Sequence, residues 1–164
     1  MINSLGLDSR TIHAFPNDCI LYRDWYEESV TCPKCQTPRY KEETCKVPRK
    51  VLRHFPLAPH IKHMLRSPKL DRLMTWVAEH KSKDGVMRVL SDSPAFEHID
   101  LQWPDFVREP HNLKMGVALD GVNPFSMKPS KCSTWPVVVI NYNLPPYLSI
   151  KKEHLMLSLL IPRK

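Results

Sequence analysis

Glycine and long apolar runs are both scarce in this chain. Only four of its 164 residues are glycine, whereas sixteen are proline. Because proline ends or kinks helices, this composition favours short elements and argues against long helices. No apolar run approaches the length of a membrane span, and the N-terminus lacks a charged segment followed by an apolar block. We therefore expect a soluble, intracellular protein.

The chain also lacks internal repeats, low-complexity tracts and a glycine-rich phosphate loop. Hydrophobic residues make up 42% of it, which is enough to bury a core. A length of 164 residues fits one domain, or one and a half.

Acidic residues are almost absent between residues 46 and 72. This segment has one acid, Asp71, and its eight basic residues account for the whole net charge of +7. A localised basic band is typical of polyanion binding and points to nucleic acid. The alternative is a solvated face whose acidic partner lies elsewhere. The eight residues are Lys46, Arg49, Lys50, Arg53, Lys62, Arg66, Lys69 and Arg72.

The five cysteines favour reduced thiols or a metal site over a disulfide framework. Cys32 and Cys35 form a C-x-x-C motif, which is half of a zinc ribbon, and Cys19 is the obvious third ligand. His13 and Cys45 are the candidates for a fourth ligand. The alternative is a set of structural cysteines without metal. Residues 1–45 are thus expected to form a Cys-rich, zinc-ribbon-like unit.

The rest of the chain predicts an α+β fold. Residues 46–110 are expected to form a basic helical connector, with short helices at 59–65, 68–78 and 94–99 that begin at proline signals. Residues 111–164 are β-rich, with strands expected at 114–119, 135–142 and 154–161. The apolar, β-branched run 137–140 is typical of a central strand.

Asp120 ends the first of these strands and is followed at once by Gly121. A carboxylate at a strand end is how nucleases and transposases of the RNase H type hold a divalent metal. The alternative is an ordinary turn, because Asp-Gly is among the commonest turn dipeptides. Glu153 is the only acidic residue after Asp120, whereas such a metal site needs at least two more acids.

Several long segments together resemble the transposases of plant CACTA (En/Spm) DNA transposons. The resemblance extends from about Leu5 to Pro162. The segments are Ile12-His13, Pro16-Asn17-Asp18-Cys19-Ile20-Leu21-Tyr22, Cys32-Pro33-Lys34-Cys35, Arg39-Tyr40-Lys41, Val47-Pro48-Arg49-Lys50-Val51-Leu52-Arg53, Phe55-Pro56-Leu57, Asp120-Gly121-Val122-Asn123-Pro124-Phe125, Ser133-Thr134-Trp135-Pro136-Val137-Val138 and Tyr142-Asn143-Leu144-Pro145-Pro146.

The resemblance implies a zinc-ribbon-like element with a structural Zn²⁺, followed by an RNase H-like catalytic domain. It implies that Asp120 matches the first acid of an Asp-Asp-Glu site, where two Mg²⁺ or Mn²⁺ ions act on a phosphodiester. It also implies transposon-end DNA as the partner, and a nuclear location.

The chain departs from the family at specific positions. Phe15 stands where the family usually has Cys, Val77 where it has His, and His111 where it has Arg. The second Asp and the Glu are not present after Asp120, so residues 111–164 are expected to be a truncated part of the catalytic domain. We expect a transposase fragment without independent catalysis. A non-enzymatic DNA-binding remnant using segment 46–72 and a non-functional open reading frame are the alternatives.

Overall fold

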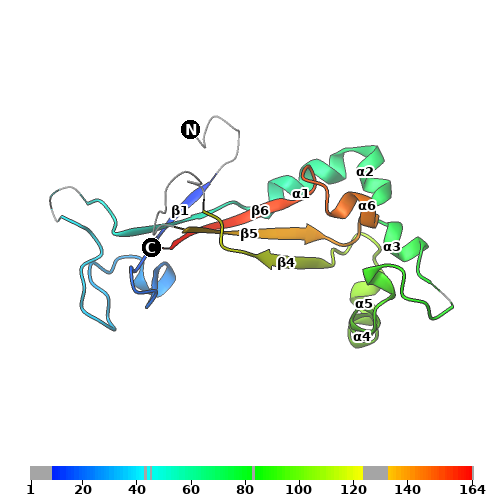
Figure 1. Ribbon diagram of the computed structural model, residues 1–164, viewed down its shortest axis with the longest axis horizontal. Helices are drawn as coiled ribbons and strands as arrows, with labels where there is room; N and C mark the ends of the chain where they lie inside the picture. The colour runs from blue at the N-terminus through cyan, green and yellow to red at the C-terminus, as the bar shows by residue number, and fades with distance from the viewer. Residues whose placement is uncertain (1–8, 43, 45, 83, 124–132, 164) are drawn as a thin grey trace. The chain divides into compact units, whose positions relative to one another are not determined.

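The computed structural model describes residues 9–42, 44, 46–82, 84–123 and 133–163. Six strands form one sheet in the order β2-β1-β3-β6-β5-β4 (Figure 1). Together with the helices they make an α+β fold, as expected. The strands are β1 (Arg10–Ala14), β2 (Leu21–Tyr22), β3 (Lys50–His54), β4 (Met115–Leu119), β5 (Ser133–Asn141) and β6 (Met156–Arg163).

The chain divides into two compact units. Unit 1 comprises Met1–Pro56, Leu119–Val137 and Leu157–Lys164, and unit 2 comprises Leu57–Ala118 and Val138–Met156. The division into residues 1–45, 46–110 and 111–164 that the sequence suggests stays a prediction.

The strands of unit 1 pair in antiparallel fashion. In the β1–β2 pair His13 lies opposite Tyr22, and in the β1–β3 pair it lies opposite Val51. On its other side β3 pairs with β6, where Arg53 lies opposite Leu160. The sequence predicted helices from residue 46 onward, whereas residues Lys50–His54 form the strand β3. Prolines before and after the segment leave too few residues for a stable helix, and pairing with two neighbours satisfies its backbone instead.

The three strands expected after residue 110 are present and adjacent, as β4, β5 and β6. Figure 1 shows that successive members of this group run in alternating directions. The sequence predicted these three strands. The sheet is larger because β1 and β3 are short strands whose apolar residues give no long run to recognise.

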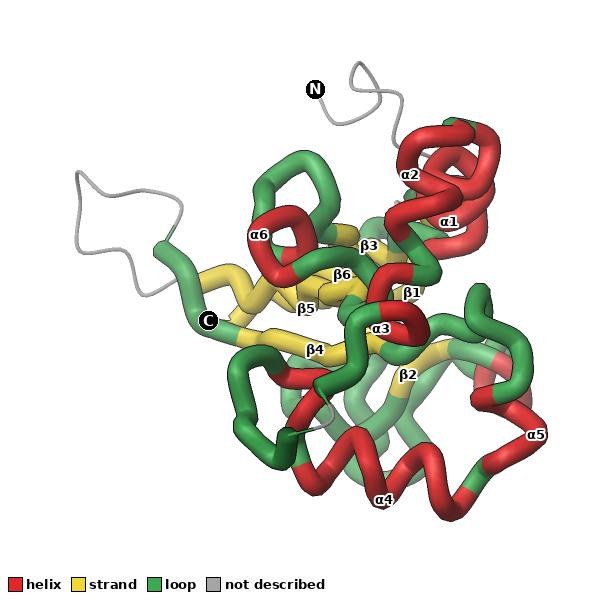
Figure 2. The backbone as a smooth tube through the Cα atoms, turned by 90° about the vertical axis from the view of Figure 1, so that its right-hand side faces the viewer, coloured by secondary structure: helices red, strands yellow, loops and turns green. Residues whose placement is uncertain are grey.

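Unit 2 contains the helices α1 to α6, drawn in red in Figure 2. Helices α1 and α2 pack side by side (Figure 2). Met64 of α1 and Met74, directly after α2, lie in a buried core. Val139 of β5, Met156 of β6 and Leu144, from the segment between these strands, complete it. The helices are α1 (Leu57–Arg66), α2 (Pro68–Leu73), α3 (Trp76–Glu79), α4 (Pro94–Gln102), α5 (Pro104–Val107) and α6 (Pro146–Ser149).

The helix expected over 68–78 is interrupted, and forms α2 and α3 instead. At the break, the hydroxyl of Thr75 donates a hydrogen bond to the carbonyl of Arg72 at 2.9 Å. Thr75 has a φ of −95° and a ψ of 0°, which is outside helical geometry. A threonine side chain that bonds to nearby backbone competes with the helical ladder, and the apolar spacing alone does not reveal this.

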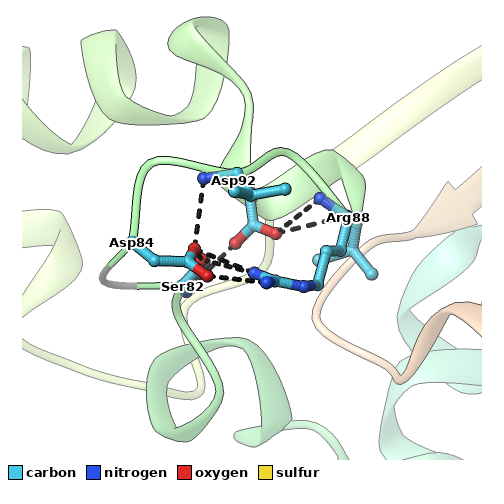
Figure 3. Close-up of polar contacts among 6 residues, drawn as sticks. Ser82, Asp84, Arg88 and Asp92 are labelled. Carbon is cyan, nitrogen blue, oxygen red and sulfur yellow. Dashed lines mark hydrogen bonds and ion pairs between the residues drawn. The ribbon is translucent and has the colours of Figure 1, made fainter.

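A polar loop joins α3 to α4 (Figure 3). The guanidinium of Arg88 donates two hydrogen bonds to the carboxylate of Asp84, at 2.8 and 2.6 Å. These bonds, with one from Ser82, hold the pKa of Asp84 well below its usual range. The Asp92 carboxylate accepts hydrogen bonds from the backbone N–H groups of Arg88, Ser82 and Val89. Side chains thus satisfy backbone N–H groups of a loop whose described residues contain one short 3-10 helix, Leu90–Asp92.

Asn143 fixes the segment before β4 to the segment after β5 within unit 2. Its side-chain oxygen accepts a hydrogen bond from the backbone N–H of Lys114 at 2.8 Å. Its side-chain nitrogen donates to the carbonyls of Pro110 and Asn112, at 3.2 and 3.0 Å. A single buried amide therefore satisfies three backbone groups that no strand pairing reaches.

Candidate functional site

Three cysteine thiols come together in unit 1. The sulfur atoms of Cys19, Cys32 and Cys35 all lie within 4.8 Å of one another. The thiol of Cys19 donates a hydrogen bond to the sulfur of Cys35, at a distance of 3.8 Å. Two sulfurs bound to one tetrahedral zinc ion at about 2.3 Å lie about 3.8 Å apart. This pair therefore already has the spacing of two zinc ligands, and the three predicted cysteine ligands form one cluster.

Tight turns position these thiols. In the C-x-x-C segment, the backbone N–H of Cys32 donates to the carbonyl of Thr37 at 3.0 Å, and that of Gln36 donates to the carbonyl of Cys32 at 2.8 Å. Gln36 adopts a φ of +58°, in the left-handed region. Asp18, directly before Cys19, also has a φ of +58°, in a conformation that Asp tolerates better than most residues.

Phe15 packs beside the cysteine cluster. Its side chain has no exposed surface and forms a small core with Cys32 and Tyr22, against which Cys19 packs. Position 15 is where the sequence predicted a missing fourth cysteine. The three thiols fit a zinc ion in donor type and spacing. The apolar ring of Phe15 donates no electron pair, so position 15 adds no fourth ligand.

The thiols differ in acidity. Burial raises the pKa of Cys19 above its ordinary value, and its hydrogen bond with Cys35 acts in the same direction. Burial also acts to raise the pKa of Cys35, but hydrogen bonds involving Thr37, Cys32 and Cys19 outweigh it and leave the pKa below its ordinary value. Because zinc binds the thiolate, and the lowered pKa favours the thiolate of Cys35, this residue loses its proton for metal binding more readily than Cys19.

His13, a predicted fourth ligand, is not part of this cluster. Its Nδ1 atom accepts a hydrogen bond from the Nε–H of Arg39 at 3.0 Å. Burial lowers the pKa of His13, and the charge of Arg39 lowers it further. A neutral ring that accepts at Nδ1 carries its proton on Nε2, so neither nitrogen offers a metal a lone pair in this arrangement. Cys45, the other candidate, lies outside the described residues.

Sequence reasoning missed Arg39, which organises unit 1. Besides bonding to His13, its guanidinium donates to the carbonyls of Glu27 and Ser29. The same group lies over the ring of Tyr22, at 4.5 Å from the ring centre. No spacing pattern marks such a residue, since its partners are spread along the chain. The only signal in the sequence was its place in one of the segments that carry the family resemblance.

Asp120 lies where the sequence placed it, directly after the end of β4. Its carboxylate is exposed and accepts a hydrogen bond from the backbone N–H of Gly121 at 2.7 Å. The Asp-Gly dipeptide is not in a turn, because the next residue, Val122, pairs with Thr134 in an antiparallel bridge. Gly121 packs closely, since a Cβ atom at this position would lie 3.0 Å from the indole of Trp135. Within the described residues, Asp120 belongs to no cluster of three or more potential metal ligands. These residues therefore do not fit a site for two divalent ions, which needs several oxygen ligands.

The eight basic residues divide between the two units. Lys46, Arg49, Lys50 and Arg53 belong to unit 1, and the other four belong to α1 and α2 of unit 2. Seven of the eight side chains are exposed. Lys50 is the exception, with 13% of its side chain exposed and its Nζ bonded to the carboxylate of Asp18 at 2.5 Å. In the described part of the chain, none of the other seven forms an ion pair.

Comparison with known proteins gives one match. Residues 84–164 match the family described as transposase family tnp2, and this segment contains Asp120 and the strands β4 to β6. The cysteine cluster and the eight basic residues precede it. No curated protein and no solved structure matches the chain. None of the described helices is long and apolar enough to cross a membrane. Through residues 84–164, the chain belongs to the transposase family tnp2, the family of the CACTA (En/Spm) transposases.

Proposed function

We propose that this chain is a DNA-binding member of the transposase family tnp2 that does not cleave DNA by itself. In this proposal the basic residues between positions 46 and 72 hold the phosphate backbone, and the three cysteines bind a structural zinc ion. The nuclear location in this proposal comes from the family resemblance.

The observation that carries the DNA-binding part is the concentration of charge. The whole net charge of +7 falls within residues 46–72, and seven of the eight basic side chains there are exposed without an acidic partner among the described residues. Lys and Arg side chains that are free to contact phosphates release counterions from DNA, which gives strong, sequence-independent binding. Family membership of residues 84–164 supports DNA as the polyanion.

The proposed lack of independent cleavage rests on the surroundings of Asp120. This residue is exposed directly after the end of β4, in the position expected for a first catalytic acid. Among the described residues it belongs to no cluster of three or more potential metal ligands. Two hard divalent ions need several oxygen ligands in a defined geometry.

The zinc part rests on the spacing of the thiols. A structural zinc ion would be held by Cys19, Cys32 and Cys35, and its binding would stabilise the turns that present them. The fourth ligand would come from a solvent molecule, or from His13 or Cys45 after rearrangement.

The experiment that tests this function compares two variants for binding to fluorescently labelled duplex DNA by anisotropy. Replacing Arg49, Lys50 and Arg53 together by Ala should weaken binding by about 100-fold or more near 0.1 M salt, since each lost phosphate contact costs nearly tenfold there. Replacing Arg23, Lys151 and Lys152 by Ala removes the same charge from exposed positions outside the basic segment and should weaken binding much less. Equal losses in the two variants would show that net charge alone, rather than segment 46–72, determines binding.

A further inference from the structure

A pocket in unit 1 gathers three cationic side chains. Its cavity has a volume of about 500 Å³, which lies in the range that accommodates small ligands. Lys41, Arg49 and Lys50 line it, and the other lining residues are Pro16, Pro48, Val51 and Pro162. No acidic residue is among the described lining residues. Arg49 and Lys50 belong to the basic segment 46–72, whereas Lys41 lies outside it.

Backbone hydrogen bonds fix the two chain segments that carry Lys41 and Arg49. The N–H of Lys41 donates to the carbonyl of Val47 at 2.9 Å, and that of Arg49 donates to the carbonyl of Arg39 at 3.0 Å. The side chain of Arg49 is oriented as well, because its Nε–H donates to the carbonyl of Tyr40 at 3.0 Å. This bond uses one of the five guanidinium donors, and among the described residues the terminal nitrogens have no protein partner.

Lys50 is the least exposed member of the group. Its ammonium bonds to one exposed carboxylate, that of Asp18, and an ammonium has three donors. A lysine that is 13% exposed loses most of its hydration, so an additional anion would offset the cost of burying its charge. The walls formed by proline and valine supply no side-chain acceptor. Low-dielectric walls around cations strengthen their attraction for an anion.

We propose that Lys41, Arg49 and Lys50 form a specific phosphate-binding pocket, which holds one phosphodiester group of the DNA backbone. Arg49 would contact two phosphate oxygens through its planar fork, and the two lysines would add point charges on either side. The identity of the ligand as DNA rests on the proposed function, whereas the affinity for a phosphate group rests on the pocket. Lys41 thereby becomes a phosphate-binding residue outside the basic segment 46–72.

The first arm of the test measures duplex binding by the full chain. Lys41→Ala should weaken binding about five- to tenfold near 0.1 M salt and make the salt dependence shallower by about one unit. Lys152→Ala removes the same charge from an exposed side chain and should change binding less than twofold. Lys41→Arg, which keeps the charge, should retain most of the affinity. An equal loss of DNA affinity in Lys41→Ala and Lys152→Ala would overturn the proposal that this pocket binds phosphate.

The second arm uses inorganic phosphate as the probe and NMR detection of the Arg49 Nε–H signal. Phosphate should shift this signal in the parent protein, and the shift should be lost in Lys41→Ala. No shift in the parent, or an unchanged shift in the variant, would overturn the phosphate site. A parent protein that binds phosphate but no duplex would contradict the proposed function and the assignment to DNA, and would identify a site for free phosphate instead.

Discussion

Phe15 packs against Cys32 in the core of unit 1, and neither side chain has any exposed surface. Position 15 was singled out in the sequence because a cysteine is usual there in the family that the chain resembles. The structure packs it against Cys32, with Cys19 beside the same small core, so Phe15 lies next to two of the three predicted cysteine ligands. The chain therefore has an apolar ring at the place where a fourth metal ligand would be expected.

We predict that the purified protein contains about one zinc ion per chain, because three thiols at this spacing supply most of a tetrahedral site. Elemental analysis of protein purified without chelator checks this. A result below about one tenth of an ion, together with rapid reaction of the thiols, would contradict it and would show that Phe15 has replaced the metal.

The variant Phe15→Cys should bind zinc more tightly than the parent, since it adds a fourth thiolate. Without zinc it should be less stable, by about 3–4 kcal/mol, because a large buried side chain is lost. Chemical unfolding with and without a chelator separates the two effects. Phe15→Ala is the matched control, since it opens the same cavity without adding a ligand. Equal zinc affinity in the two variants, measured by competition with a chelator, would contradict a fourth thiolate ligand at position 15.

We predict that the chain with Mg²⁺ or Mn²⁺ does not nick DNA that carries transposon ends, because Asp120 belongs to no cluster of potential metal ligands among the described residues. Gel analysis of supercoiled substrate checks this with high sensitivity. Metal-dependent nicking that disappears in Asp120→Ala would refute the prediction and would make this chain an enzyme.

The ion pairs of Asp100 should contribute to the stability of unit 2. Its carboxylate bonds to Lys81 at 2.9 Å and also to Lys114, of which only 14% of the side chain is exposed. Asp100→Asn should destabilise the protein by about 2–3 kcal/mol, because Lys114 would lose its partner. Asp105→Asn, which breaks an exposed pair with Arg108, should cost less than about 1 kcal/mol. Urea unfolding at pH 7 measures the free energy of unfolding of both variants. Equal losses would contradict the larger contribution of the Asp100 ion pairs.

The same carboxylate should make stability depend on pH. Burial acts to raise the pKa of Asp100, but Lys114 and Lys81 outweigh it and hold the pKa below its ordinary value. A lowered pKa in the folded state means that the stabilisation is complete above the unfolded-state pKa of about 3.9 and is lost as the pH falls below it. Unfolding measured between pH 7 and pH 2 should therefore show a smaller decrease for Asp100→Asn than for the parent. An identical decrease would exclude this contribution.

Asn143 should tolerate substitution poorly. Asn143→Ala leaves the N–H of Lys114 and two carbonyls without partners, at an expected cost of about 3 kcal/mol. Asn112→Ala removes only a hydrogen bond donated to the carbonyl of Phe106, and should cost about 1 kcal/mol. Thermal and urea unfolding of both variants checks this ranking of stability losses. A larger loss in Asn112→Ala would show that the Asn143 amide is not the more important hydrogen-bonding group.

The sequence predicted the elements whose signals are local. Helices α1 and α4 and strands β4 to β6 follow from proline starts and apolar spacing, and the side chain of Ser93 indeed caps α4 by accepting a hydrogen bond from Phe96. Strand β3 could not be predicted in the same way, because its conformation depends on pairing with β1 and β6, which are distant in sequence.

The site was predictable to a similar extent. The C-x-x-C spacing and the separate Cys19 were enough to anticipate the thiol cluster. The bond between His13 and Arg39 was not predictable, since nothing in the sequence relates these two positions. Lys41 was missed for the same reason, because it lies outside the charge-rich segment and shares a pocket with Arg49 and Lys50 only after folding.

The salt dependence of DNA binding by the parent chain tests the central claim most directly. Binding to two duplexes of unrelated sequence should weaken equally as salt rises, with a log–log slope of about −4 to −5 for roughly four to six neutralised phosphates. Anisotropy titrations between about 0.05 and 0.3 M salt measure this slope. A slope near zero, or a strong preference for one duplex, would contradict a basic surface that holds the phosphate backbone without reading bases.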